Sequence, residues 1–177
     1  NEGSRPMLVE IQALTAPTNF GTPRRAVVGW DAGRLNMILA VLETRCNLSF
    51  SSSDVYLNVA GGLRITEPAA DLAVAAALIS SLNDVPVPSN TIIFGEIGLS
   101  GEIRPVGRSD RRLKEASKLG FSQAITPNLQ RKNGGKKKGA STYNNLTVRE
   151  FTNLNELLDD ICAEPAIPHF SSASRKH

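Results

Sequence analysis

The stretch that decides the fold runs from Tyr56 to Ala73 and reads YLNVAGGLRITEPAADLA. Its first half alternates apolar and polar residues like a β-strand, and Gly61 and Gly62 indicate a bend or bulge within it. Pro68 then suits the first turn of a helix, where its missing N–H would have no partner in any case. The Ala-rich continuation predicts a helix over 68–82 that packs on a sheet. We expect four apolar residues on its buried face: Leu72, Ala75, Ala76 and Ile79.

Outward from this stretch, turn-forming residues divide the chain into strand-like and helix-like segments. Strands are predicted over residues 7–14, 24–30, 54–65, 91–97, 102–106, 123–126 and 146–151. Helices are predicted over residues 31–45, 68–82, 110–119 and 154–161. Gly98 to Gly101 indicates a hairpin between two of the strands. This irregular alternation favours an α+β domain over a doubly wound parallel sheet.

Composition is that of an ordinary soluble domain. Of the 177 residues, 41% are hydrophobic and 21% charged, but only 5% are aromatic, so we expect an aliphatic core. No apolar run is long enough to cross a bilayer, and the first residues show no signal-peptide pattern. The missing initiator Met favours a piece of a longer chain. Cys46 and Cys162 lack any C-x-x-C spacing, so we interpret both as inert apolar fillers rather than zinc ligands or a disulfide framework.

The sequence offers few residues for a catalytic nucleophile, a metal site or a nucleotide-binding site. His169 and His177 both fall in a Ser-rich stretch over 164–177, which we interpret as a flexible tail, so the folded body has no histidine for a nucleophile system or a metal site. The segment 134–141 approaches a P-loop, but Ala140 stands where the phosphate-binding Lys belongs. We therefore interpret residues 128–145 as a solvated basic loop and expect no ATP hydrolysis from this piece alone.

Basic residues remain, in three clusters, on a chain with a formal net charge of +3 and a pI of about 9.1. Neutralising phosphates needs only cations on a shared face, while the alternative is that these are ordinary solvated charges. Aromatic platforms for stacking bases are scarce, because Trp30, Phe50 and Tyr56 have the pattern of core residues. The candidate DNA contacts are Arg24, Arg25, Arg34, Arg104, Arg108, Arg111, Arg112, Lys132, Lys136, Lys137 and Lys138.

The motifs over 56–73 and over 94–107, FGEIGLSGEIRPVG, resemble the Lon-type proteolytic domain. In detail they are closer to the C-terminal domain of the RadA (Sms) family of DNA repair ATPases, whose junction with a RecA-like ATPase core resembles residues 2–14. The resemblance covers residues 2–161. It implies a junction over 1–6 from a missing ATPase domain and a Lon-like domain over 7–163.

The residues aligned with the Lon catalytic dyad differ from those that Lon proteases use. Lon proteases use a Ser nucleophile and a Lys base, and here Ala69 and Asp110 occupy those positions. A methyl group cannot attack a carbonyl, and Lys114, one turn further along, would have no hydroxyl to activate. We therefore expect no peptidase activity. For Glu67 and Asp71, helix capping or ion pairing with a nearby Arg is favoured over a contact with a partner subunit.

The resemblance implies a non-catalytic scaffold and DNA-binding module in a hexameric ring whose ATPase drives branch migration. Its expected partners are single-stranded and branched DNA, further copies of itself and a recombinase, with no membrane. No cofactor is expected in this chain; ATP, Mg²⁺ and a zinc finger would belong to upstream domains. The expected location is intracellular, in a bacterial cytoplasm or a DNA-containing organelle. Two alternatives stay open: a peptide-binding module that keeps the protease groove, and an active Lon-type peptidase, against which Ala69 and Asp110 argue.

Overall fold

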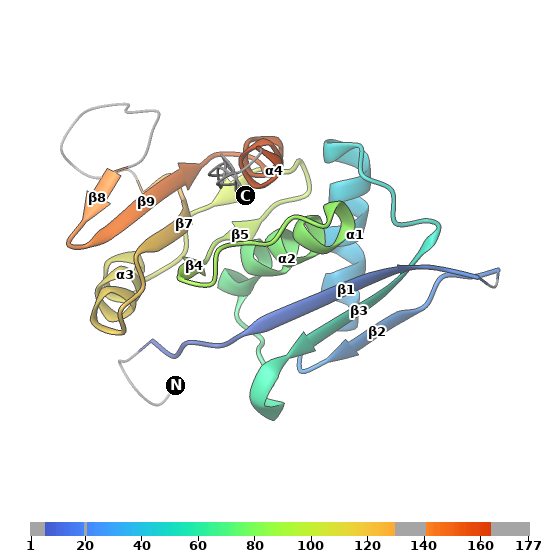
Figure 1. Ribbon diagram of the computed structural model, residues 1–177, viewed down its shortest axis with the longest axis horizontal. Coiled ribbons are helices and arrows are strands. Elements are labelled where there is room, and N and C mark those ends of the chain that lie inside the picture. The colour runs from blue at the N-terminus through green and yellow to red at the C-terminus, as the bar shows by residue number, and fades with distance from the viewer. Residues whose placement is uncertain (1–5, 20, 130–140, 164–177) are drawn as a thin grey trace, which may run out of the picture.

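The computed structural model describes residues 6–19, 21–129 and 141–163. A three-stranded sheet forms one side of the molecule (Figure 1). In spatial order its strands are β1 (Ile11–Pro17), β3 (Ser53–Val59) and β2 (Arg25–Val28). The central β3 pairs antiparallel with β1 and parallel with β2. Alternate β3 residues, Val55, Leu57 and Val59, are buried in the main core.

Two helices, α1 (Ala32–Cys46) and α2 (Asp71–Asn83), pack against this sheet. A third helix, α4 (Leu154–Cys162), packs on α1 and α2. Asp31 caps α1, since its side chain accepts a hydrogen bond from the Arg34 amide at 2.7 Å. Short 3-10 turns at Ala60–Gly62 and Pro68–Ala70 lead from β3 into α2. The four residues expected on the buried face of α2 are all fully buried, which confirms that prediction.

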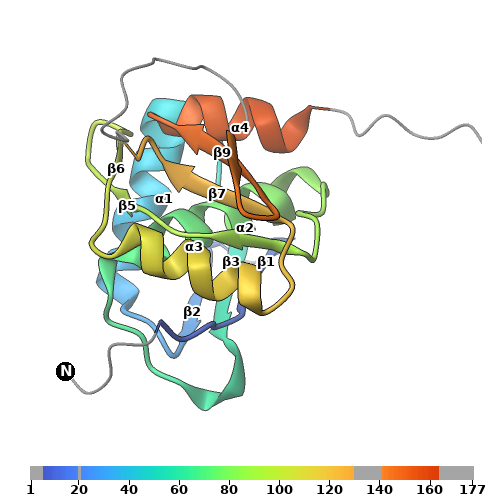
Figure 2. The same ribbon diagram turned by 90° about the vertical axis from the view of Figure 1, so that its left-hand side faces the viewer.

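A second, mixed sheet lies on the other side of α2. In spatial order its strands are β4 (Thr91–Ile93), β7 (Gln123–Pro127), β9 (Leu146–Phe151) and β8 (Ser141–Tyr143). The first three are parallel and β8 is antiparallel to β9. Ile93 and Ile125 face the main core, whereas Ile92 and Ala124 face a smaller core under α3 (Ser109–Lys118). Figure 2 shows α3 in front of this sheet.

The α+β expectation agrees with this arrangement of mixed sheets and packed helices. Several element assignments were wrong. The predicted hairpin is reduced to β5 (Glu96–Ile97) and β6 (Ile103–Arg104), because Thr91–Ile93 joins the second sheet instead. Residues 141–143, assigned to the basic loop, form β8 through pairing with β9. The first strand occupies Ile11–Pro17 rather than 7–14, because its register follows β3.

Two side-chain interpretations also need correction. Cys46 is buried, as expected, but Cys162 is exposed near the end of α4 and fills no core space. Trp30 and Phe50 are buried, whereas Tyr56 lies exposed on the outer face of the first sheet. None of the helices in the described part of the chain has the length and apolar character needed to span a membrane. Among the same residues, no group of three His, Cys, Asp or Glu side chains is placed to hold a metal ion.

Candidate functional site

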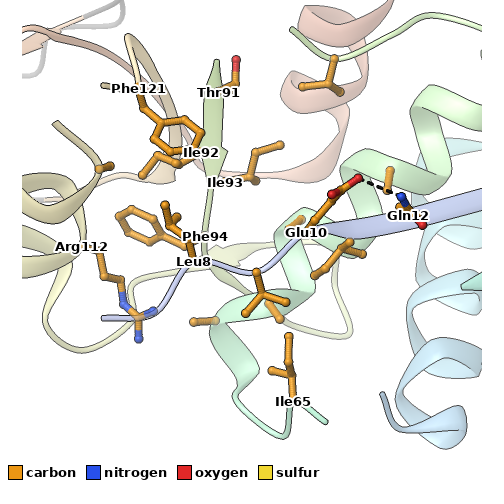
Figure 3. A pocket seen from close by; sticks show the side chains of 18 of the residues that line it. Leu8, Glu10, Gln12, Ile65, Thr91, Ile92, Ile93, Phe94, Arg112 and Phe121 are labelled. Atoms are coloured by element: carbon orange, nitrogen blue, oxygen red, sulfur yellow. Dashed lines mark hydrogen bonds between the residues drawn. The ribbon is translucent and has the colours of Figure 1, made fainter. Parts of the chain in front are cut away.

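A groove of about 1560 Å³ runs along α2, between the edge of the first sheet and the edge of the second. Its floor is a row of small residues on one face of α2 and the turn before it: Ala69, Ala73 and Ala77. Around the groove, Figure 3 shows Ile93 of β4 and Phe94 directly after it, Arg112 of α3, and Leu8 and Glu10 of the segment that leads into β1. The groove therefore combines an apolar floor with charged side chains on its walls.

Both walls of the groove contain a strand edge that pairs with no other strand in the described part of the chain. The carbonyl of Glu10 accepts from the Ala60 amide (3.0 Å), and the Thr18 amide donates to the Ser52 carbonyl (2.9 Å), so even-numbered residues of β1 face β3. The amides and carbonyls of Ile11 and Ala13 consequently face the other way.

The same reasoning applies to β4. The Phe94 amide donates to the Ile125 carbonyl of β7 at 3.2 Å, so the backbone groups of Ile93 face away from β7. At the ends of these edges, the Thr15 amide bonds Ser81 Oγ and the Gly95 amide bonds the Ala69 carbonyl, each at 2.9 Å. Between those anchors, the groove presents backbone donors and acceptors of the kind that pair with an extended chain.

Ala69 lies in the 3-10 turn before α2, at one end of the groove, and is 5% exposed. Its carbonyl bonds the Gly95 amide, and the Leu72 amide donates to the Gly95 carbonyl at 3.1 Å, so the helix start is fixed to the chain that follows β4. Asp110 is exposed in the first turn of α3. The side chain at position 69 is a methyl group, which supplies no nucleophile. The absence of peptidase activity stays a prediction.

An ion pair lies at this end of the groove. Arg112 of α3 donates to the carboxylate of Glu67, which precedes Pro68. The same guanidinium donates to the Gly107 carbonyl at 3.2 Å and lies 5.8 Å from the centroid of the Phe94 ring, within cation–π range. Arg112 therefore ties α3 to the start of α2.

A second pair lies inside the fold. Asp71 is completely buried and receives two hydrogen bonds from Arg34 of α1, each 2.5 Å long, and a third from the Ile97 amide at 3.1 Å. Hydrogen bonding between its guanidinium and Asp71 raises the pKa of Arg34. A fully satisfied buried carboxylate joins α1, α2 and β5. The ion-pairing interpretation of Glu67 and Asp71 is confirmed.

The candidate DNA contacts fall into two groups: side chains that already have a hydrogen-bond or ion-pair partner within the fold, and side chains without such a partner among the described residues. Arg25 donates to the carbonyls of Ser53 (2.5 Å) and Phe50 (2.8 Å), and Arg104 pairs with Glu102. Together with Arg34 and Arg112, these guanidinium groups already have partners within the fold. The side chains of Arg24 and Arg108 are exposed, and neither guanidinium has a partner among the described residues.

The clusters do not lie together. Figure 1 shows the start of β2, with Arg24 and Arg25, at the far end of the molecule from α3. On α3, Arg111, Lys114 and Lys118 are exposed at a spacing that places them on one face of the helix. Lys132, Lys136, Lys137 and Lys138, together with His169 and His177, lie outside the described residues.

Comparison of the sequence with known proteins places this chain in a family. The family model described as subunit ChlI of Mg-chelatase matches residues 19–130, well over half of the chain. The chain belongs to the ChlI family. This ChlI-family chain is also 65% identical over 127 residues to the DNA repair protein RadA of Brucella abortus (strain 2308), which covers 72% of this chain and 27% of that protein.

Relatives with the same name occur in distant bacteria. The DNA repair protein RadA of Synechocystis sp. (strain ATCC 27184 / PCC 6803 / Kazusa) is 54% identical over 129 residues, covering 73% of this chain and 26% of that protein. The protein of that name from Aquifex aeolicus (strain VF5) is 52% identical over 126 residues, covering 71% of this chain and 28% of that protein. The ChlI-family chain thus spans little more than a quarter of the length of these curated relatives.

Sequence reasoning missed the groove and its strand edges. The small residues Ala69, Ala73 and Ala77 recur every four positions, and this spacing is the one signal that points to an open helix face. Nothing local indicates that β1 and β4 are edge strands, because strand order depends on pairing between distant segments.

Proposed function

We propose that this ChlI-family chain is a non-catalytic, Lon-like module of a RadA-type DNA repair protein. The observation that carries the proposal is the 65% identity to a protein named DNA repair protein RadA. In this proposal the complete protein is a DNA-dependent ATPase that forms a hexameric ring and acts in branch migration, with single-stranded and branched DNA and a recombinase as partners. Its ATP, Mg²⁺ and zinc finger belong to domains outside this chain, and it works wherever DNA is kept, in a bacterial cytoplasm or an organelle.

The DNA contact is electrostatic and centres on α3. Arg108 is exposed at the start of the helix, and Lys114 and Lys118 project from the same helix into solvent. Cations of this kind neutralise phosphates without reading bases, so binding is insensitive to sequence and falls with salt. Repetition of the helix in every subunit of a ring raises the avidity of an otherwise weak contact. Arg24, at the other end of the molecule, forms a second and separate candidate contact.

The test uses the complete protein on single-stranded and branched DNA across a salt series. Neutralising Arg108, Lys114 and Lys118 to Gln removes three positive charges. For single strands, the slope of log K against log salt should then shrink by about 2, since each phosphate contact contributes about 0.7.

The matched control adds three negative charges on exposed α1 positions through Asn36→Asp, Ala40→Glu and Thr44→Glu. Net charge falls equally in both variants, but only the α3 variant should lose slope. Equal losses in the two variants would mean that net charge, rather than α3, drives binding. An unchanged slope in both variants would mean that DNA binding is not a function of this chain.

A second candidate function is peptide binding, which the free strand edges of Ile11, Ala13 and Ile93 favour. An extended peptide would add a strand along one of these edges. The probe is a seven-residue Val/Thr peptide, measured by calorimetry against the same peptide N-methylated at every internal amide. Backbone pairing predicts binding by the first peptide and none by the second. Equal affinities would contradict strand addition, and the α3 experiment would be unaffected.

A further inference from the structure

Leu99 occupies the tip of the turn between β5 and β6 and is 68% exposed. The turn is held rigidly around it. The Gly98 amide donates to the Glu102 carbonyl and the Gly101 amide to the Gly98 carbonyl, both at 3.0 Å. Ser100 donates to the Glu102 carboxylate through its amide (3.1 Å) and its hydroxyl (2.8 Å). Leu99 is thus an apolar side chain presented to water on a fixed support.

Two helices brace the same turn from the protein side. The Leu154 amide, at the start of α4, donates to the Gly101 carbonyl at 2.9 Å. Arg45, near the end of α1, donates to the Leu99 carbonyl at 3.4 Å and remains exposed. Because the backbone of this turn is already held in place, docking of Leu99 costs little backbone entropy, which is the property of a preorganised anchor. The anchor carries a positive charge beside it.

The end of the groove where α2 finishes has the complementary character. Ala77 on α2 and Val85 and Val87 in the following connector line it. Asp84 lies at the same end, exposed, with no cation paired to it within the described residues. An apolar recess beside an unpaired carboxylate matches an apolar anchor beside an exposed arginine.

The anchor and the recess lie on different parts of the surface. Leu99, Arg45 and Leu154 do not line the groove. One molecule therefore cannot fill its own recess with its own anchor, whereas a second copy can, and a contact between two different patches is head-to-tail. Head-to-tail contacts generate a closed ring when the rotation closes and a filament when it does not.

We propose that Leu99 of one copy docks into the groove of the next, between Ala77 and Val87, with Arg45 opposite Asp84. This inference rests on the self-association in the proposed function and assigns the surfaces that make it. It also gives the groove an occupant, namely another copy of this chain. Each subunit of a ring would then contribute one anchor and one recess.

Sedimentation of the 177-residue chain tests the contact. Leu99→Asp should weaken association about 30-fold or more, as removal of a central interface anchor does. Leu119→Asp, at another exposed leucine, is the matched control and should leave association unchanged. Arg45→Asp and Asp84→Arg should each weaken association, and their combination should restore it. Circular dichroism of each variant confirms that the fold is kept.

Mixing variants gives the sharpest outcome. Leu99→Asp retains the recess, and Ala77→Trp, which fills the recess, retains the anchor. Each should be monomeric alone, and the mixture should form a one-to-one dimer that grows no further, because only one intact contact exists per pair. Larger mixed assemblies, or no mixed dimer, would overturn the inference. A wild-type chain that stays monomeric up to about 1 mM, the weak end of specific association, would also overturn it.

The ring is tested separately in the complete protein by native mass measurement. A complete protein that is hexameric with and without Leu99→Asp overturns the anchor and leaves the proposed ring standing. A complete protein that is monomeric overturns both. A wild-type hexamer that dissociates when Leu99 is replaced supports both.

Discussion

Two arginine–carboxylate pairs flank the start of α2, and they differ in how far they are removed from water. The side chain of Asp71 is 0% exposed and that of its partner Arg34 is 28% exposed. Glu67 is 56% exposed and its partner Arg112 20% exposed. Water screens the outer pair, whereas the inner carboxylate depends wholly on its protein partners. The same pair of chemical groups is therefore a structural necessity at one position and a minor contact four residues earlier.

The comparison is tested most severely by placing a second carboxylate in the core, one residue further along the helix. Leu72 is fully buried, so Leu72→Asp would place a carboxylate in the core without the cation that Asp71 has. We expect the free energy of unfolding to fall by more than about 4 kcal/mol, measured by urea denaturation. Leu72→Met conserves volume and should lose less than about 1.5 kcal/mol. An unchanged midpoint for Leu72→Asp would refute the burial of this position.

Removal of Asp71 itself should have the next largest effect. Asp71→Ala leaves the Arg34 guanidinium partly buried and unpaired, and loss of one partner of a buried pair typically destabilises by about 3–5 kcal/mol. The control replaces both partners, as Arg34→Met with Asp71→Leu. That variant should recover most of the loss, because no uncompensated charge remains. A double variant as unstable as Asp71→Ala would show that the pair has a role beyond neutralising itself.

The outer pair should be nearly dispensable. Glu67→Ala removes an exposed partner, and Arg112 keeps its bond to the Gly107 carbonyl and its contact with Phe94. We expect a change of about 0–1 kcal/mol in the free energy of unfolding, which shrinks further at high salt. A loss as large as that of Asp71→Ala would mean that exposure does not distinguish the two pairs.

The smallest expected effect concerns an exposed carboxylate whose pKa is shifted. A hydrogen bond from Ser100, followed by bonding to the backbone and to Arg104, lowers the pKa of Glu102 from 4.5 to about 2. A lowered pKa stabilises the fold above pH 4.5, and this contribution disappears as the pH falls from 4.5 toward 2. Glu102→Gln should be slightly less stable at pH 7 and should lose less stability on acidification. Parallel pH–stability curves for the two proteins would contradict the shift.

Elements with local signals were predicted closely. The helix expected over 31–45 is Ala32–Cys46, because Asp31 supplies a cap, and the helix expected over 110–119 is Ser109–Lys118, followed by Gly120 with φ +88°. Strand partners were predicted poorly. Thr91–Ile93 pairs with Gln123–Ile125, about thirty residues later, and no local pattern specifies that choice.

The candidate site shows the same division. The ion pairing of Glu67 and Asp71 could be predicted, since it follows from residue types near a helix start. The loss of Lon-type chemistry at positions 69 and 110 stays a prediction from the resemblance. The separation of Arg24 from α3 could not, because it depends on how the two sheets pack about α2. The groove was missed for the same reason, since its walls come from the edges of two different sheets.

By itself, the sequence determined the residue types available for chemistry, the helical periods and the caps that begin and end helices, because these depend on side chains a few positions apart. Only the tertiary structure decided which arginine meets which carboxylate. Arg34 and Asp71 are 37 residues apart in the chain, and burial of the α1 and α2 faces brings them together. Because burial also removes the water that would screen them, the fold sets both the partner and the strength of the interaction.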